Sequence, residues 1–226
     1  MKRTAALIIA FTICLLLCAC GQEDSYSGKK GKRREKEKFT YSEAESASGN
    51  DEKEESGADD LFKRVGGEYV FSSGAGGWST DITLNADGTF EGEYHDSNYL
   101  DENNVEILCS KFHGRFSKVK KVNEYTYSAE LADLTHDTQT GTEEIIGQSD
   151  LLPGGQEIWR YTEAYGLEKC RKVIFYLKGA PMSSLPEEFI IWGNGTVGIT
   201  GEESTLPMNG FYNTEEEYGF FRWEDA

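Results

Sequence analysis

The sequence predicts an all-β fold, mainly antiparallel, in the form of a β-barrel of about eight strands with one short helix. A β-sandwich is the alternative arrangement of the same strands. Two observations predict this class. Apolar and polar side chains alternate over several short segments, which is the period of a half-buried strand. Turn residues separate these segments at short intervals, and few segments carry a helical period.

The clearest local signal is a β-hairpin over residues 78–94. Large or β-branched residues alternate with polar ones on both sides of the turn Asn85-Ala86-Asp87-Gly88. Gly88 supplies the left-handed conformation that such a turn requires. One face of the hairpin is therefore expected to carry Trp78, Thr80, Ile82, Leu84, Phe90, Gly92 and Tyr94.

Further strands are predicted where β-forming residues cluster between turn signals: residues 68–72, 106–116, 124–131, 156–162, 171–178, 196–200 and 220–223. Gly114 marks a bulge or bend in the second of these, and residues 119–123 form the turn that follows it.

Helix is expected in one place. The run Ser184-Leu185-Pro186-Glu187 resembles a capping box with proline in the first turn, so one short helix should run to Ile191. Residues 142–149 and 162–168 could each add a helical turn.

The first residues predict export. Lys2 and Arg3 precede an apolar stretch from Ala5 to Ala19, which is the layout of a secretory signal. The stretch is shorter than the roughly 20 residues that cross a bilayer. We therefore expect three parts: a signal peptide over residues 1–19, a charged tether over residues 20–60, and one β-barrel-like domain over residues 61–226.

The cleavage region Leu17-Cys18-Ala19-Cys20-Gly21 resembles the bacterial lipobox. That resemblance implies cleavage before Cys20 and transfer of diacylglycerol to its thiol. The mature protein would be a lipoprotein held by this lipid anchor, with its palmitate-like chains, on the extracytoplasmic face of the cell membrane. The alternative is an ordinary cleaved signal with incidental cysteines.

The charge pattern narrows the class of partners. The formal net charge is −17, and an acidic domain argues against nucleic-acid binding, since phosphate contacts need lysine and arginine. Residues 29–38 hold seven basic and two acidic side chains, whereas residues 43–60 hold eight acidic and one basic. The basic run lies near the expected anchor, so it either contacts anionic lipid headgroups or is a solvated linker.

No residue pattern indicates catalysis. The chain lacks a Gly-x-Ser-x-Gly elbow, a P-loop and a His-Glu-x-x-His motif, so we expect no enzyme and no cofactor. Cys109 and Cys170 are the cysteines of the expected domain, and they form either a disulfide or two separate thiols.

Two groups of residues are candidates for binding. Asp96, Asn98 and Asp101 lie in a segment dense in oxygen ligands, which is compatible with a metal such as calcium or with an ordinary turn. Four aromatic residues at alternating strand positions could line a ligand site or simply belong to the core: Trp78, Tyr94, Tyr125 and Tyr127.

Gly76-Gly77-Trp78 resembles the Gly-x-Trp signature of lipocalins, whose tryptophan plugs one barrel end. More broadly, residues 71–90, the run Leu185-Pro186-Glu187-Glu188-Phe189 and the run Gly210-Phe211-Tyr212 resemble uncharacterised lipoproteins of Gram-positive (Firmicute) gut bacteria. The resemblance implies a lipocalin-like fold and a membrane location, and it implies no activity.

The expected function follows from these observations. The chain should be a membrane-anchored, non-enzymatic module that binds a small apolar or amphipathic ligand or an envelope protein partner. A structural or inhibitory envelope protein is the first alternative. A hydrolase acting on wall or glycan, with two close carboxylates, is the second.

Overall fold

The computed structural model describes residues 60–223, which belong to one compact unit, Ser48–Ala226. Cys20, the expected signal peptide and the tether up to residue 59 lie outside the described residues. Among the described residues, no helix is long and apolar enough to cross a membrane.

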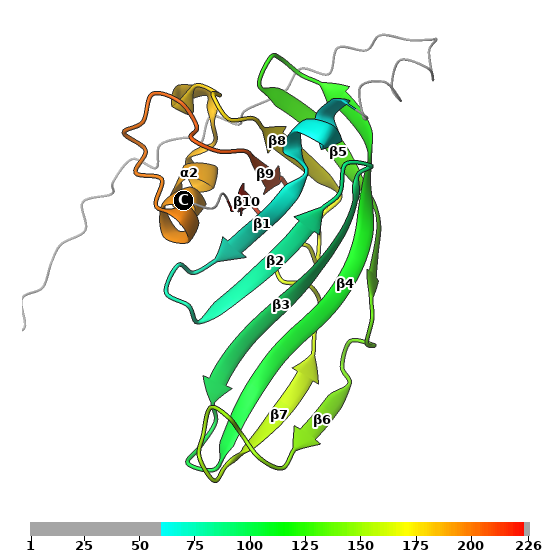
Figure 1. Ribbon diagram of the computed structural model, residues 1–226, viewed down its shortest axis with the longest axis vertical. Coiled ribbons are helices and arrows are strands. Elements are labelled where there is room, and N and C mark those ends of the chain that lie inside the picture. Colours follow the sequence, from blue (N-terminus) through cyan, green and yellow to red (C-terminus); the bar gives the residue numbers. More distant parts are fainter. Residues whose placement is uncertain (1–59, 224–226) are drawn as a thin grey trace, which may run out of the picture. The chain divides into compact units, whose positions relative to one another are not determined.

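Eight antiparallel strands close into a barrel, so the predicted fold class is confirmed. Around the ring each strand is hydrogen-bonded to the next, and the β3–β4 pairing completes the circle (Figure 1). In ring order the strands are β1 (Gly67–Ser72), β2 (Trp78–Leu84), β3 (Thr89–Tyr99), β4 (Asn104–Lys121), β5 (Thr126–His136), β8 (Lys172–Tyr176), β9 (Gly210–Asn213) and β10 (Tyr218–Arg222).

The barrel interior is filled with aromatic rings. Strand alternation turns these side chains inward, and each of them is at most 2% exposed: Tyr69, Phe71, Phe90, Phe112, Phe116, Phe175, Phe211 and Phe220. Phe211 and Phe220 are cross-strand partners whose rings stack at 4.5 Å with an interplanar angle of 9°. The barrel is therefore a packed core, not an open cup.

Two glycines make room for these rings. A Cβ on Gly92 would lie 2.6 Å from Phe112 Cζ, and one on Gly114 would lie 2.6 Å from Phe90 Cζ. In the register Gly92 faces Phe112 and Gly114 faces Phe90, so each ring covers the glycine on the neighbouring strand. The register shift predicted near Gly114 occurs just after it, between Arg115 and Phe116.

Both ends of the barrel are closed. A helical segment at residues 60–65 buries Leu61, Phe62 and Val65 at one end. Residues 162–171 cross the other end and bury Ala164 and Leu167. At this second end, Trp78 packs against Phe71 and Tyr165, with ring centroids 4.9 Å apart in both pairs.

One α-helix, α2 (Glu187–Val197), packs on the outside of the barrel after a short 3-10 turn, η1 (Met182–Ser184). Phe189 from α2 inserts among Tyr176, Tyr212 and Phe221, whose side chains face outward from β8, β9 and β10. This second core covers that side of the barrel.

Strand β4 has 18 residues and runs on past the barrel. Its second half pairs with β5, but its first half, Asn104 to Cys109, pairs in parallel with β7 (Gln156–Tyr161). Strand β6 (Glu143–Ile146) then pairs antiparallel with β7. The far ends of β3 and β4 together with β7 and β6 form a single projecting sheet, which we call the extension (Figure 1).

Several local predictions were wrong. Residues 142–149 contain strand β6 instead of a helical turn, because β7 offers them a strand edge. Residues 196–200 end α2 and form its C-cap, with Gly198 at φ 77°, instead of forming a strand. Strand β4 continues to Lys121, so the turn expected at 119–123 begins later.

The capping box is also absent. Pro186 is the N-cap of α2, and the Ser184 hydroxyl donates a hydrogen bond to the Pro181 carbonyl oxygen at 2.7 Å. The helix itself is present and longer than expected.

Candidate binding site

A hollow of about 800 Å³ lies where the barrel meets the extension. It forms because the inner face of β4 continues beyond residues 162–171, which close the barrel. We call it the mouth hollow. Its lining residues are Tyr94, Glu106, Leu108, Thr140, Gly141, Thr142, Glu143, Arg160, Tyr161, Thr162, Glu163, Tyr165 and Glu168. Its volume is within the range of small-molecule sites.

Aromatic side chains form the barrel end of the mouth hollow. The rings of Tyr94 and Tyr165 lie 5.8 Å apart, and Tyr165 rests on Trp78. Residues 162–171 are held there by two hydrogen bonds, from Thr80 Oγ1 to the Tyr165 carbonyl oxygen (2.7 Å) and from Asn213 Nδ2 to the Gly166 carbonyl oxygen (2.8 Å). The tyrosine faces are therefore fixed in position.

The potential at this end is negative. Burial raises the pKa of Tyr94 to about 12, and the carboxylates of Asp96 and Glu168 add to the increase. Partial burial also raises the pKa of Glu168, with a further contribution from neighbouring Glu216. Burial, the largest cause of both shifts, disfavours charge of either sign, whereas the nearby carboxylates of Asp96, Glu168 and Glu216 contribute a negative potential that favours a cation.

The floor of the mouth hollow carries an ion triad. Arg160 Nε donates a hydrogen bond to Glu143 Oε2 at 2.9 Å, and Arg160 Nη1 donates to Glu106 Oε1. The register explains the contact, because Arg160 pairs with Glu143 on β6 and with Leu108 on β4. The hydrogen bond with Glu143 and the Glu106 carboxylate hold the pKa of Arg160 above its usual value.

The triad leaves an excess of negative charge. The lining residues comprise four carboxylates, from Glu106, Glu143, Glu163 and Glu168, and one guanidinium. The side chain of Glu106 is only 13% exposed, so its charge is poorly screened.

Ser110 carries an unsatisfied hydroxyl on β4, opposite a residue that lines the hollow. It is 3% exposed, lies across from Tyr94 in the register, and its Oγ has no hydrogen-bond partner among the described residues. A buried hydroxyl without a hydrogen-bond partner is costly, so a bound ligand that supplied a partner would gain from contacting it.

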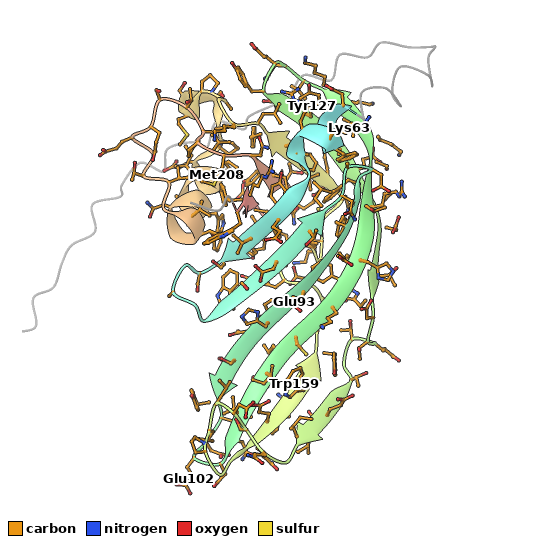
Figure 2. The ribbon with its side chains drawn as sticks, viewed as in Figure 1. Lys63, Glu93, Glu102, Tyr127, Trp159 and Met208 are labelled. Atoms are coloured by element: carbon orange, nitrogen blue, oxygen red, sulfur yellow. The ribbon has the colours of Figure 1, made fainter. Side chains whose placement is uncertain are left out.

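The four aromatic ligand candidates do not form one site. Trp78 and Tyr94 come together beside Tyr165. Tyr127 lies near the opposite barrel end, where its hydroxyl accepts a hydrogen bond from Arg64 Nη1 at 3.1 Å. Tyr125 packs against the core at that end, and a Cβ added to Gly179 would lie 3.2 Å from the Tyr125 ring. Figure 2 shows Tyr127 beside Lys63, far from Trp159 and Glu102.

The metal candidates are occupied by local hydrogen bonds. Asp101 Oδ1 accepts hydrogen bonds from the Asn103 N–H (2.7 Å) and from Asn104 Nδ2 (2.9 Å). Asp96 Oδ1 accepts from the Ser97 N–H, and Asn98 Nδ2 reaches Glu106 Oε2. In residues 60–223, no group of three or more histidine, cysteine, aspartate or glutamate side chains has a metal-binding arrangement.

Cys109 lies opposite His95 in the register, but among the described residues its Sγ contacts the Arg160 carbonyl oxygen at 3.9 Å and His95 Nδ1 lies 3.4 Å from Ser79 Oγ. Cys109 and Cys170 are free thiols, so the disulfide alternative is not realised. His113 Nδ1 pairs with Asp137 at 3.1 Å, and His136 Nε2 accepts a hydrogen bond from the Ala164 N–H.

A second hollow of about 670 Å³ lies on the outer face of β1 to β4. Its lining holds Lys111 and five carboxylates, from Glu68, Asp81, Glu91, Glu93 and Asp137. Asp81 faces Glu93 directly in the register, and Lys111 Nζ lies 3.9 Å from Glu93 Oε2. Figure 2 shows Glu93 midway along the sheet.

Sequence reasoning missed most of the mouth hollow. Glu106, Glu143 and Arg160 are far apart in the chain, and only the parallel pairing of β4 with β7 brings them together. In the sequence these three residues appear only as single charged residues in separate segments, and nothing in the sequence indicates that they meet.

No protein-family model matches the chain, and neither a curated protein nor a solved structure is significantly similar to it.

Proposed function

We propose that the protein is a membrane-anchored, extracytoplasmic binding module whose mouth hollow takes a small amphipathic ligand with a cationic amine group. The observation that carries the proposal is the lining of the hollow, with the tyrosine faces of Tyr94 and Tyr165 at one end and excess carboxylates around the rest. Aromatic faces and carboxylates are the groups that bind organic cations.

Two further features support an external site. The barrel interior is filled by aromatic rings and closed at both ends, so a ligand has to bind outside the core. The Ser110 hydroxyl, which has no hydrogen-bond partner among the described residues, lies across from Tyr94 of the hollow, and a polar ligand group could satisfy it after a side-chain movement.

The anchoring part of the proposal rests on the lipobox at Leu17 to Cys20. The substitution Cys20→Ala is expected to move the full chain out of the membrane fraction and to abolish incorporation of labelled palmitate. Retention of Cys20→Ala in the membrane fraction, with labelled lipid on the chain, would contradict a lipid anchor at this cysteine.

Binding is tested with defined probes. Spermidine and a short alkylamine are titrated against the full chain by calorimetry at low salt, with glucose and an uncharged alcohol of equal length as comparisons. We expect heat and thermal stabilisation with the amines alone. Stabilisation by the neutral compounds instead, or by none of the four, would overturn this ligand class.

A matched pair of variants locates the site. Glu168→Gln removes a carboxylate of the mouth hollow, and Glu91→Gln removes one from the outer face of β3 with the same change in net charge. Amine affinity is expected to fall several-fold in Glu168→Gln and to stay unchanged in Glu91→Gln. Equal losses in both would indicate general attraction to an acidic surface.

A further inference from the structure

Strand β6 is the outermost strand of the extension and has a free backbone edge. Within the described residues it pairs with β7 alone, and all four of its residues are exposed. A free edge offers a row of unpaired N–H and C=O groups to another strand.

The hydrogen-bond pattern shows which groups are free. The N–H groups of Gln156 and Thr162 donate to β4, at the Asn103 and Cys109 carbonyl oxygens, so even-numbered residues of β7 face β4. Tyr161 N–H donates to the Thr142 carbonyl oxygen, so odd-numbered residues face β6. With Trp159 opposite Glu144 and Glu157 opposite Ile146, these two residues of β6 face β7.

The remaining N–H and C=O groups of β6, at Glu143 and Ile145, therefore lie in the plane of the sheet and point away from β7, toward solvent. Alternation places the groups of Gly147 on the same line. A strand that adds here in antiparallel register forms hydrogen-bonded pairs at Glu143 and Ile145.

The edge is short and carries two glutamates, Glu143 and Glu144, which are common protections of a free edge. Its other half is unprotected, because Ile145 (61% exposed) and Ile146 (43% exposed) present apolar side chains. Other exposed apolar residues of the extension are Tyr99, Leu100 and Leu151, and the Tyr99 hydroxyl is hydrogen-bonded to the Leu151 carbonyl oxygen. Exposed apolar side chains gathered in one region mark an interaction surface.

We propose that the edge of β6 binds an extended segment of a partner protein by strand addition, and that the segment is apolar at two positions and basic at the next two. Antiparallel pairing sets this order, because the incoming strand meets Ile146 and Ile145 first and then Glu144 and Glu143. Glu143 also lines the mouth hollow, but strand addition at this edge does not require amine binding there.

Charge favours a basic partner over a second copy of the chain. In a two-fold pairing centred on Ile145, Glu144 of each copy would lie diagonal to Glu144 of the other, and both chains carry a formal net charge of −17. A basic segment meets the carboxylate of Glu144 and that of Glu143 instead, although Arg160 already binds the Glu143 carboxylate. The extension lies at the end of the domain away from Lys63, and thus away from the start of the described chain, so this edge is accessible in a tethered protein (Figure 2).

The probe is the labelled peptide Thr-Val-Ile-Lys-Arg-Thr, and Thr-Val-Ile-Glu-Glu-Thr is its charge-reversed control. Anisotropy titrations with the full chain should show saturable binding of the basic peptide alone. Amide exchange at Glu143 and Ile145 should slow when the basic peptide is bound. Equal affinity for both peptides, or unchanged exchange at these amides, overturns the proposal.

Two variants keep the test independent of folding. Ile145→Pro blocks the edge without removing a bond to β7, since the Ile145 N–H faces outward, and it should weaken binding at least about tenfold. Glu144→Lys should weaken the basic peptide and strengthen the charge-reversed one. Unchanged peptide binding in Ile145→Pro, with amine binding intact, places the peptide elsewhere and sinks the inference.

The oligomeric state is the remaining outcome to measure. Sedimentation of the full chain is expected to show a monomer with and without peptide. A dimer that Ile145→Pro dissociates would assign the edge to a second copy and overturn the basic partner.

Discussion

The barrel and the extension share strands β3 and β4 but bury their side chains in different ways. Inside the barrel, inward residues such as Phe90 and Phe112 are at most 2% exposed and contact other rings. Past the barrel the same inner face carries Leu108 and Glu106, which line an open hollow. One sheet therefore supplies a packed core where it closes on itself and the proposed binding surfaces where it does not.

The largest expected effect lies in the barrel core. Phe220→Ala removes one ring of the stacked pair with Phe211 and should cost about 3–5 kcal/mol of unfolding free energy. Ile145→Ala removes a 61% exposed side chain of the extension and should change the unfolding free energy by no more than about 0.5 kcal/mol. Denaturant unfolding measures both, and similar losses would show that the extension belongs to the same cooperative core.

A smaller contrast is expected for glycine. Gly92→Ala places a Cβ 2.5 Å from the Asp81 carbonyl oxygen and 2.6 Å from Phe112 Cζ, so it should cost about 1–3 kcal/mol. Gly147→Ala, beside β6, meets nothing within 4 Å and serves as the control. An equally stable Gly92→Ala would mean that the rings of the barrel can shift, and the packed interior described above would be wrong.

Much of the barrel was predictable from sequence because β2, β3 and β5 alternate apolar and polar residues. Strand β9 was not predicted, since all four of its residues are buried and show no alternation. The hairpin from Trp78 to Tyr94 was found with the correct turn, and Gly88 has the expected positive φ of 82°. Local alternation encodes which face is buried. The chain between β5 and β8 and between β8 and β9 is long, so tight turns alone did not specify the closure of the barrel.

The extension was not predictable, for a physical reason. Residues 143–146 have no alternation of buried and exposed side chains, so no period identifies a strand. The pairing of β6 with β7 is local, but the parallel pairing of β7 with β4 joins residues 52 positions apart, such as Asn104 and Gln156. The mouth hollow depends on those two pairings. The sequence therefore shows its charged residues one by one but does not predict that they form one site.

Glu157 tests how the extension is held together. Its carboxylate accepts hydrogen bonds from Trp159 Nε1 (2.8 Å), Ser149 Oγ (3.1 Å) and the Asp150 N–H (3.2 Å), which tie residues 149–152 to β7. Glu157→Gln should weaken this link by about 1 kcal/mol. Faster amide exchange at residues 149–152 with an unchanged global unfolding midpoint is the expected result.

The same group predicts a pH dependence. The hydrogen bond from Trp159, followed by the one from Ser149, lowers the pKa of Glu157 below its usual value of 4.5. A depressed pKa gives stabilisation that is complete above the usual value and is lost as the pH falls through the folded-state value. Below pH 4.5 exchange at residues 149–152 should therefore rise in the wild type and change less in Glu157→Gln. Identical pH profiles would assign the acid response to other carboxylates.

The two cysteines provide the finest comparison, because one lies in each region. Burial raises the pKa of Cys170 to about 12, with additions from Glu215 and Glu216, so at pH 8 only about one thiol in ten thousand is ionised. Burial also raises the pKa of Cys109, but its side chain is partly exposed beside β7 and pairs only weakly with the Arg160 carbonyl oxygen.

In the Cys20→Ala chain, produced without its signal peptide, an alkylating reagent should modify Cys109 first, and mass spectrometry measures the modification. Cys170 should react at the rate of barrel unfolding, so that Phe220→Ala accelerates Cys170 and leaves Cys109 unchanged. Acceleration of both thiols together would show that the extension opens only when the barrel does.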